Sequence, residues 1–159
     1  MHILLTRSLE DSKDLIVKFK SNGFKISNLP LLEFSKLSYE KINPSSFDAI
    51  IFTSSNAIKF LELKNINKNI LCFCVGSSTE KTARLKGFQK VFAADGNVRN
   101  LKELVDQNLT SKDKRILYVS GEIVSYPLDK ELLLEGYNVN RLVNYSVRHK
   151  ENLELSFLN

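Results

Sequence analysis

Four short segments rich in hydroxyl-bearing residues or glycine each follow an apolar run of the sequence. They are residues 6–8, 53–56, 76–79 and 120–122. Where such a segment joins a strand to a helix, its free backbone N–H groups and hydroxyls suit a carboxylate or a phosphate group. Any single segment also has a simpler explanation, because Ser, Thr and Asn cap helices in many proteins. Agreement at four places favours an anion site without identifying the anion.

The other residue types that commonly carry out chemistry are sparse. No glycine-rich dinucleotide fingerprint and no P-loop motif is present. The two histidines, His2 and His149, offer little to a catalytic triad or a metal site, and Asp48 begins its apolar run, the wrong end for a phosphate acceptor. Cys72 and Cys74 are expected on one face of a buried strand, as free thiols rather than metal ligands. The chemistry is therefore expected to depend on positioning and backbone donors.

The composition indicates a folded, soluble protein of a reducing compartment. Of the 159 residues, 43% are hydrophobic and 26% are charged, as in ordinary globular domains. No apolar stretch approaches the roughly 20 residues of a membrane span, and the N-terminus lacks a signal-peptide pattern. The net charge of +5 favours acidic partners, but the basic residues are scattered and no nucleic-acid-binding motif is present. We therefore expect a cytoplasmic protein that binds neither membranes nor nucleic acid.

Apolar runs of strand length alternate with amphipathic stretches of helix length. Strands are expected at residues 2–6, 24–29, 47–53, 70–75, 91–93, 115–119 and 139–145, and helices at 8–20, 57–61, 78–86, 101–109 and 127–134. Because the strands are continuous apolar runs, this alternation predicts an α/β fold whose parallel sheet is covered by helices on both faces. Residues 32–46 and 147–151 break the rhythm and are interpreted as connectors.

A series of short motifs extends from residue 1 to about residue 145. It consists of ILLTR at 3–7, GF at 23–24 with LPLLEF at 29–34, FDAIIFTSSNA at 47–57, CVGSST at 74–79 with GF at 87–88, LYVSG at 117–121, and LLLEG at 132–136 with VNY at 143–145. Each motif alone is weak. Their order and spacing together resemble those of the uroporphyrinogen-III synthase family.

The resemblance implies two flavodoxin-like α/β lobes joined by a two-stranded connector. Residues 1–32 would form the N-terminal βαβ part of the first lobe, residues 33–147 the second lobe, and residues 148–159 a return connector. The implied activity is that of a lyase of haem biosynthesis, which closes the polycarboxylate hydroxymethylbilane to uroporphyrinogen III. The reaction expels the substrate hydroxyl as water and inverts the last pyrrole ring through a spiro intermediate. The family uses no cofactor and no metal.

The resemblance also assigns roles to individual residues. Tyr145 matches the tyrosine that is thought to assist departure of the hydroxyl, although a strand-end tyrosine also often covers the edge of a core. Arg7 matches a first-strand arginine, whose simpler role is a surface ion pair. Ser55 and Asn56 stand where some members have Pro-Arg, which removes one carboxylate partner. The residues with an implied role in substrate binding are Arg7, Thr53, Ser54, Gly76, Ser77, Ser78, Thr79 and Gly121.

Family members are usually considerably longer than 159 residues, so the rest of the first lobe has no counterpart before Asn159. The strands expected at 2–6 and 24–29 would then lack cover. A truncated gene product, a sequence ending early, and completion of the lobe by a second copy or another chain are all compatible with this pattern. Besides the enzyme, two alternatives stay open: a non-catalytic ligand-binding fragment, and a flavodoxin-like partner-binding domain that self-associates through the incomplete lobe.

Overall fold

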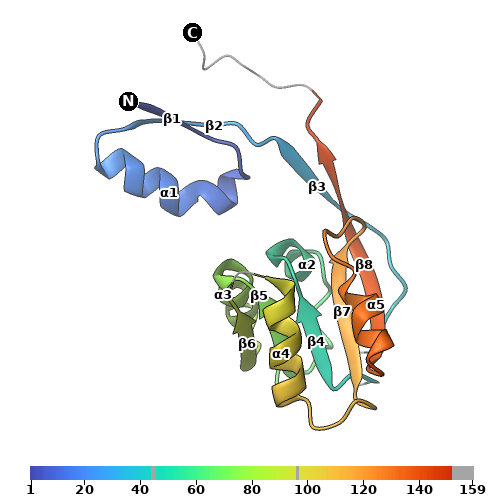
Figure 1. Ribbon diagram of the computed structural model, residues 1–159. Coiled ribbons are helices and arrows are strands. Elements are labelled where there is room, and N and C mark those ends of the chain that lie inside the picture. Colours follow the sequence, from blue (N-terminus) through green and yellow to red (C-terminus); the bar gives the residue numbers. More distant parts are fainter. Residues whose placement is uncertain (44–45, 96, 152–159) are drawn as a thin grey trace. The chain divides into compact units, whose positions relative to one another are not determined.

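The computed structural model describes residues 1–43, 46–95 and 97–151, and its contacts divide the chain into two compact units (Figure 1). Unit 1 comprises Met1–Ser35 and the residues from Val147 onward, and unit 2 is Lys36–Ser146. Both units contain strands, and all helices except the first lie in unit 2 among the described residues. None of these described helices is long and apolar enough to cross a membrane.

Unit 1 is built on β1 (His2–Leu5), α1 (Leu9–Ser21) and β2 (Lys25–Asn28), with β1 and β2 paired in parallel. The Ser8 hydroxyl accepts a hydrogen bond from the Asp11 N–H and caps α1. The Asn28 side-chain amide donates to the carbonyl oxygens of Leu5 and Arg7, at 3.1 and 3.0 Å. This amide therefore fixes the short segment after β1, which carries Arg7.

The strands of unit 1 are poorly covered. β1 alternates exposed and half-buried residues, and β2 is half-buried apart from exposed Lys25. Leu4 on β1 and Leu9 and Val17 on α1 are 46%, 58% and 69% exposed. A two-stranded parallel sheet with one helix has only one covered face, so this exposure is what a single βαβ arrangement dictates.

Unit 2 contains most of the main sheet. In spatial order the strands of the whole sheet are β3 (Leu32–Lys36), β8 (Asn138–His149), β7 (Arg115–Gly121), β4 (Ala49–Phe52), β5 (Leu71–Val75) and β6 (Lys90–Ala94). All of β3 except Lys36 belongs to unit 1. All pairs from β8 to β6 are parallel. Every residue of the central strand β4 is fully buried. These observations confirm the predicted α/β class with a parallel sheet.

Four helices belong to unit 2: α2 (Ser55–Lys59), α3 (Ser77–Leu85), α4 (Val98–Asn108) and α5 (Leu128–Leu134). Leu101 of α4 and Leu132 of α5 share one apolar cluster with Ile51 of β4. Neighbouring residues of a strand point to opposite faces, and Phe52 accordingly meets Phe88, which follows α3, edge-on at 5.8 Å. The sheet is therefore packed on both faces, which explains why its strands are continuous apolar runs.

Two strands extend into segments that the sequence assigns to connectors. β3 lies within residues 32–46, and β8 continues four residues past the predicted end at Tyr145 to His149. The side chains of β3 are exposed except half-buried Phe34, and β8 past Tyr145 runs from buried Ser146 and half-buried Val147 to two exposed residues. The two strands are neighbours in the sheet, and pairing through backbone hydrogen bonds leaves no apolar pattern in the sequence.

The two cysteines lie in the core, as predicted. Cys72 and Cys74 are fully buried free thiols on β5, and their sulfur atoms are 3.8 Å apart. The contact with Cys74 and burial raise the pKa of Cys72, so the thiol stays protonated and behaves as a small apolar side chain.

Candidate functional site

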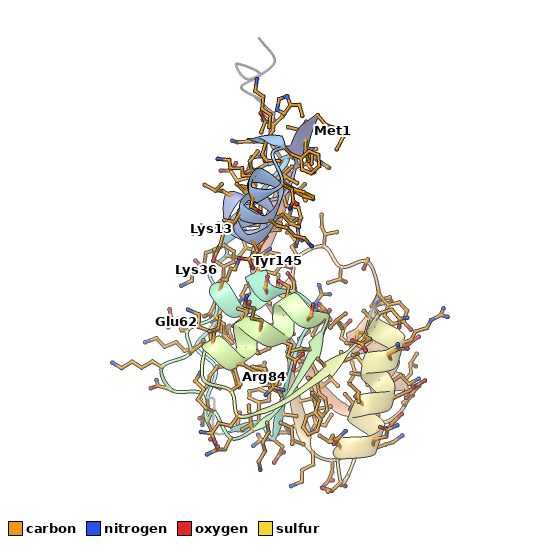
Figure 2. All side chains as sticks on the ribbon, turned by 90° about the vertical axis from the view of Figure 1, so that its left-hand side faces the viewer. Met1, Lys13, Lys36, Glu62, Arg84 and Tyr145 are labelled. Carbon is orange, nitrogen blue, oxygen red and sulfur yellow. The ribbon has the colours of Figure 1, made fainter. Side chains whose placement is uncertain are left out.

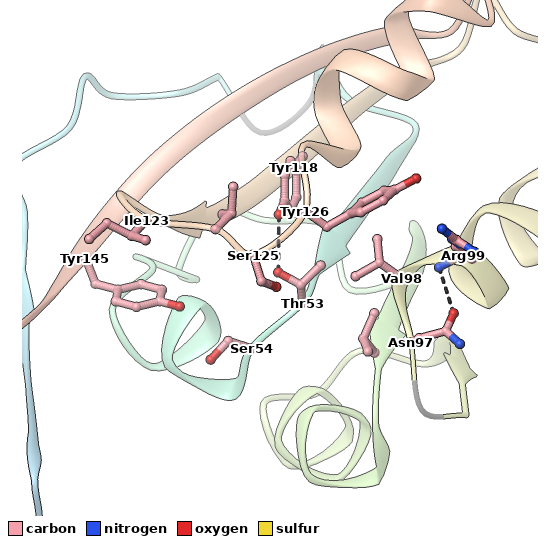
Figure 3. A pocket seen from close by; sticks show the side chains of 12 residues that line it. Thr53, Ser54, Asn97, Val98, Arg99, Tyr118, Ile123, Ser125, Tyr126 and Tyr145 are labelled. Carbon is pink, nitrogen blue, oxygen red and sulfur yellow. Dashed lines mark hydrogen bonds between the residues drawn. The ribbon is translucent and has the colours of Figure 1, made fainter.

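A pocket of about 660 Å³ opens at the carboxyl-terminal edge of the sheet in unit 2 (Figure 3). It is formed by the ends of β4, β5, β7 and β8 and by the loops that follow β6 and β7. The residues that line it are Thr53, Ser54, Val75, Asn97, Val98, Arg99, Tyr118, Ile123, Val124, Ser125, Tyr126 and Tyr145. This is the edge at which parallel α/β sheets bind ligands, and the volume is that of a small-molecule site.

Thr53 and Tyr118 place two hydroxyl groups together on neighbouring strands. Tyr118 of β7 pairs with Ile51 of β4, two residues before Thr53, so the two side chains point to the same side of the sheet. Their oxygen atoms are 3.3 Å apart, and Tyr118 is only 1% exposed. Burial raises the pKa of Tyr118, and the hydrogen bond with Thr53 opposes this in part. The phenol therefore remains protonated at neutral pH and can donate a hydrogen bond.

Tyr145 reaches the pocket through an irregularity in the pairing of β7 with β8. Ser120 lies opposite Val143, whereas the next residue, Gly121, lies opposite Tyr145, so β8 carries one extra residue at this point. Such a bulge turns a side chain away from the regular alternation of a strand. Figure 3 shows the Tyr145 ring extending from β8 toward Ser54.

Two neighbours hold the Tyr145 ring. Phe60 packs against it with ring centroids 6.0 Å apart, and the backbone of Gly121 lies against its other end. A Cβ atom placed on Gly121 would be 2.7 Å from Cζ of Tyr145 and 3.0 Å from its hydroxyl. The absence of a side chain at Gly121 therefore makes the space that the phenol occupies.

Ser54 enters the pocket from the start of α2. Its hydroxyl accepts a hydrogen bond from the Asn56 N–H at 3.2 Å, so Ser54 acts as the N-cap of α2. The helix is tied to the sheet by Asn144, a fully buried residue of β8 whose side-chain amide donates to Ala57 O at 2.8 Å. Ser54 and Tyr145 are thus positioned by the same strand.

The structure brings together only part of the set predicted from the sequence. Thr53, Ser54 and Tyr145 line the pocket, and Gly121 supports the Tyr145 ring. Of the segment after β5, Val75 reaches the pocket, Thr79 is buried, and Ser77 lines a separate shallow hollow on α3. Gly76 and Ser78 are not among the described lining residues of the pocket. Arg7 belongs to unit 1.

Two further segments complete the pocket and were not predicted from the sequence. Asn97, Val98 and Arg99 form the start of α4 after β6, and residues 123–126 form the loop after β7. Arg99 is the one ionised side chain among the described lining residues, so it is the charged group that a ligand in the pocket would meet. The loop after β6 follows a strand end like the four segments singled out above, and that position was the signal available in the sequence.

Asn97 is the N-cap of α4 and fixes the first turn of the helix, which carries Arg99. Its side-chain oxygen accepts hydrogen bonds from the N–H groups of Arg99 and Asn100, at 2.9 and 3.1 Å. We expect Asn97→Ala to lower the free energy of unfolding by about 1 kcal/mol, because two N–H groups lose their acceptor. Urea titration followed by circular dichroism measures the change. Gln107→Ala, at an exposed position of the same helix, is the control, and an equal loss in both variants would contradict a capping role.

No group of three or more His, Cys, Asp or Glu side chains is arranged to hold a metal ion within the described ranges 1–43, 46–95 and 97–151. The described pocket offers hydroxyl groups, phenols and one guanidinium group. This set suits a carboxylate-bearing ligand, and a phenol within it can transfer a proton to a leaving oxygen.

Comparison with known proteins places these features in a family. The family model described as uroporphyrinogen-III synthase HemD matches residues 13–158. The crystal structure of uroporphyrinogen-III synthetase from Helicobacter pylori 26695 is 31% identical over 84% of this chain and 59% of its own, with a TM-score of 0.60. A mutant uroporphyrinogen III synthase from the extremely thermophilic bacterium Thermus thermophilus shares the fold at 15% identity, covering 94% of this chain and 64% of its own, with a TM-score of 0.57. No curated protein gave a significant match. The chain therefore spans about three fifths of the length of these solved structures.

Proposed function

Since the chain belongs to the uroporphyrinogen-III synthase family, we propose that its pocket closes hydroxymethylbilane to uroporphyrinogen III. The observation that carries the proposal is the meeting of Thr53, Ser54 and Tyr145 in one pocket of about 660 Å³ at the ligand-binding edge of the sheet. The sequence motifs that resemble the family supply all three of these residues. The proposal therefore joins family membership to a specific place in this chain.

The chemistry of the pocket suits the first step of this reaction. The terminal carbon–oxygen bond of the substrate breaks, and the oxygen leaves as water once it receives a proton. A Tyr145 phenol that lines the pocket is suitably placed to donate that proton, and the electron pair of the broken bond leaves with the oxygen. The freed terminal carbon then bonds to the already substituted α-carbon of the last pyrrole, which gives the spiro intermediate. The bond from that α-carbon to its original bridging carbon breaks, the bridging carbon bonds to the free α-carbon of the same ring, and loss of the proton from that α-carbon restores the pyrrole with the ring inverted. Holding the two ends of the substrate together is mainly a matter of orientation, which a preformed pocket provides.

A product assay on the 159-residue chain tests the proposal. Freshly generated hydroxymethylbilane is added, and the ratio of type III to type I porphyrin is measured after oxidation. Spontaneous closure gives the type I ring, so a reaction without protein is the internal baseline. We expect type III above that baseline. Type I alone, from a chain with a normal circular dichroism spectrum, would overturn the proposal that the described pocket suffices.

Arg99 is proposed to bind a substrate carboxylate at the mouth of the pocket. We expect Arg99→Gln to raise KM roughly three- to tenfold, because a charge-assisted hydrogen bond is lost, and to leave kcat within about a factor of two. Steady-state measurement of type III formation separates the two constants. Arg115→Gln is the matched control, because Arg115 is exposed at the opposite end of β7. A fall in kcat with unchanged KM would assign Arg99 a different role.

We also propose that the protein works in the cytoplasm on a small-molecule substrate. Both cysteines are free and buried in the described core, which fits a reducing compartment. Immunofluorescence or fractionation of expressing cells tests this, and recovery in the membrane or secreted fraction would contradict it.

A further inference from the structure

The loop between β7 and α5 forms one wall of the pocket yet has little regular structure of its own. Four of its residues, 123–126, line the pocket. At its two ends, backbone hydrogen bonds join Glu122 N–H to Tyr145 O at 2.9 Å and Leu128 N–H to Tyr126 O at 2.9 Å. A loop without strand or helix pairing keeps one shape only where side chains fix it.

Arg141 contacts the start of this loop from the neighbouring strand. Its Cα is paired with that of Tyr118, so the side chain rises from β8 beside β7. The Nε–H donates to Ser120 Oγ at 2.8 Å, and the Nη2–H groups donate to the carbonyl oxygens of Gly121 and Glu122, at 2.9 and 3.2 Å. The guanidinium group thus binds three consecutive residues where β7 ends.

The same guanidinium group also contacts the far end of the loop. Its Nη1 atom is 3.8 Å from Oδ2 of Asp129, in the first turn of α5. The side chains of Arg141 and Asp129 are 23% and 16% exposed, so this ion pair is less screened by solvent than a surface pair. One side chain therefore joins the residue before the loop to the helix after it.

We propose that Arg141 is a positioning residue that closes the loop of residues 122–127 into the wall of the pocket. Its effect on turnover rests on the proposed function, whereas its effect on the loop does not. The planar guanidinium group is required because it presents separate N–H donors in fixed directions. A lysine at this position would supply the charge without reaching both carbonyl oxygens and the carboxylate together.

Amide hydrogen exchange measures the loop directly. In Arg141→Gln, we expect exchange at residues 121–128 to become roughly tenfold faster or more, because charge-assisted hydrogen bonds are lost at both ends. Exchange of β4 amides should stay unchanged. Arg141→Lys is expected to show an intermediate increase, and Asp129→Asn a smaller one confined to the α5 end. Arg84→Gln is the matched control: Arg84 lies on α3 (Figure 2), where it pairs with Glu80 and donates to Val91 O.

The kinetic readout distinguishes this inference from the proposed function. In an active chain, Arg141→Gln should raise KM roughly tenfold, because the substrate must order the loop that it meets. If the wild-type chain forms no type III product, the proposed function fails, but the exchange result still decides the role of Arg141. Unchanged exchange at residues 121–128 in a folded Arg141→Gln variant would overturn the inference. Faster exchange spread evenly over the whole sheet would overturn it too.

Discussion

Gly121→Ala is expected to reduce type III formation about a hundredfold, because the added methyl group takes the space of the Tyr145 phenol. The new Cβ would lie 2.7 Å from the ring, closer than carbon atoms approach in folded proteins. The ring must move, and with it the hydroxyl that faces the pocket. Overpacking of this kind also costs about 1–3 kcal/mol of stability. The rate comes from the product assay and the stability from urea titration.

A double variant isolates the contact between Gly121 and Tyr145. Tyr145→Leu shortens the side chain, so adding Gly121→Ala to it should cost less stability than adding Gly121→Ala to the wild-type chain. The double variant should nevertheless stay inactive, because it has no phenol. An equal stability cost in both backgrounds would show that Gly121 is constrained by something other than the Tyr145 ring.

Tyr145→Phe is expected to lower kcat for type III formation about a hundredfold, with KM little changed. The ring stays in place against Gly121 and Phe60, so only the proton donor is removed. The free energy of unfolding should change by no more than about 1 kcal/mol, the net contribution of one hydrogen bond. Single-turnover measurement of product formation separates loss of chemistry from loss of binding.

Tyr39→Phe provides the matched control for this variant. The Tyr39 hydroxyl accepts a hydrogen bond from Glu62 N–H at 2.8 Å, and it does not line the pocket. Its removal should leave turnover unchanged. If Tyr145→Phe keeps the wild-type rate while Tyr145→Leu loses it, the ring would be needed for shape and the hydroxyl would not act as the proton donor.

The parallel sheet could be predicted because its strands are buried on both faces. β4, β5 and β7 are apolar runs too short for ordinary helices and without the alternation of half-exposed strands, and glycines such as Gly87 and Gly136 end the helices between them. β3 was missed because pairing at the edge of a sheet leaves its side chains mostly exposed. The apolar pattern of the sequence therefore predicts the buried strands and does not reveal an exposed strand such as β3.

The candidate site was only partly predictable, for a different reason. Thr53 and Ser54 follow a recognisable strand, but Tyr145 was identified through the family resemblance and reaches the pocket through a bulge that depends on pairing with β7. Arg99 follows a strand end, but nothing local marks its side chain for the pocket, and Arg141 carries no local signal, since both roles arise from segments brought together by folding. Periodicity along one segment cannot show which side chains of another segment will meet it.

Within five residues, β8 carries out three tasks of unit 2. Arg141 closes the loop after β7, Asn144 holds α2, and Tyr145 faces the pocket. A substitution that shifts the backbone at one of these residues also displaces the other two. The effects of substitutions at the three positions on stability and activity should therefore not be additive. During evolution this strand is therefore a place of strong epistasis, where a substitution is acceptable only on a background already adjusted for it. A chain that acquires a new preference in this pocket has an easier route through the loops after β6 and β7 than through β8.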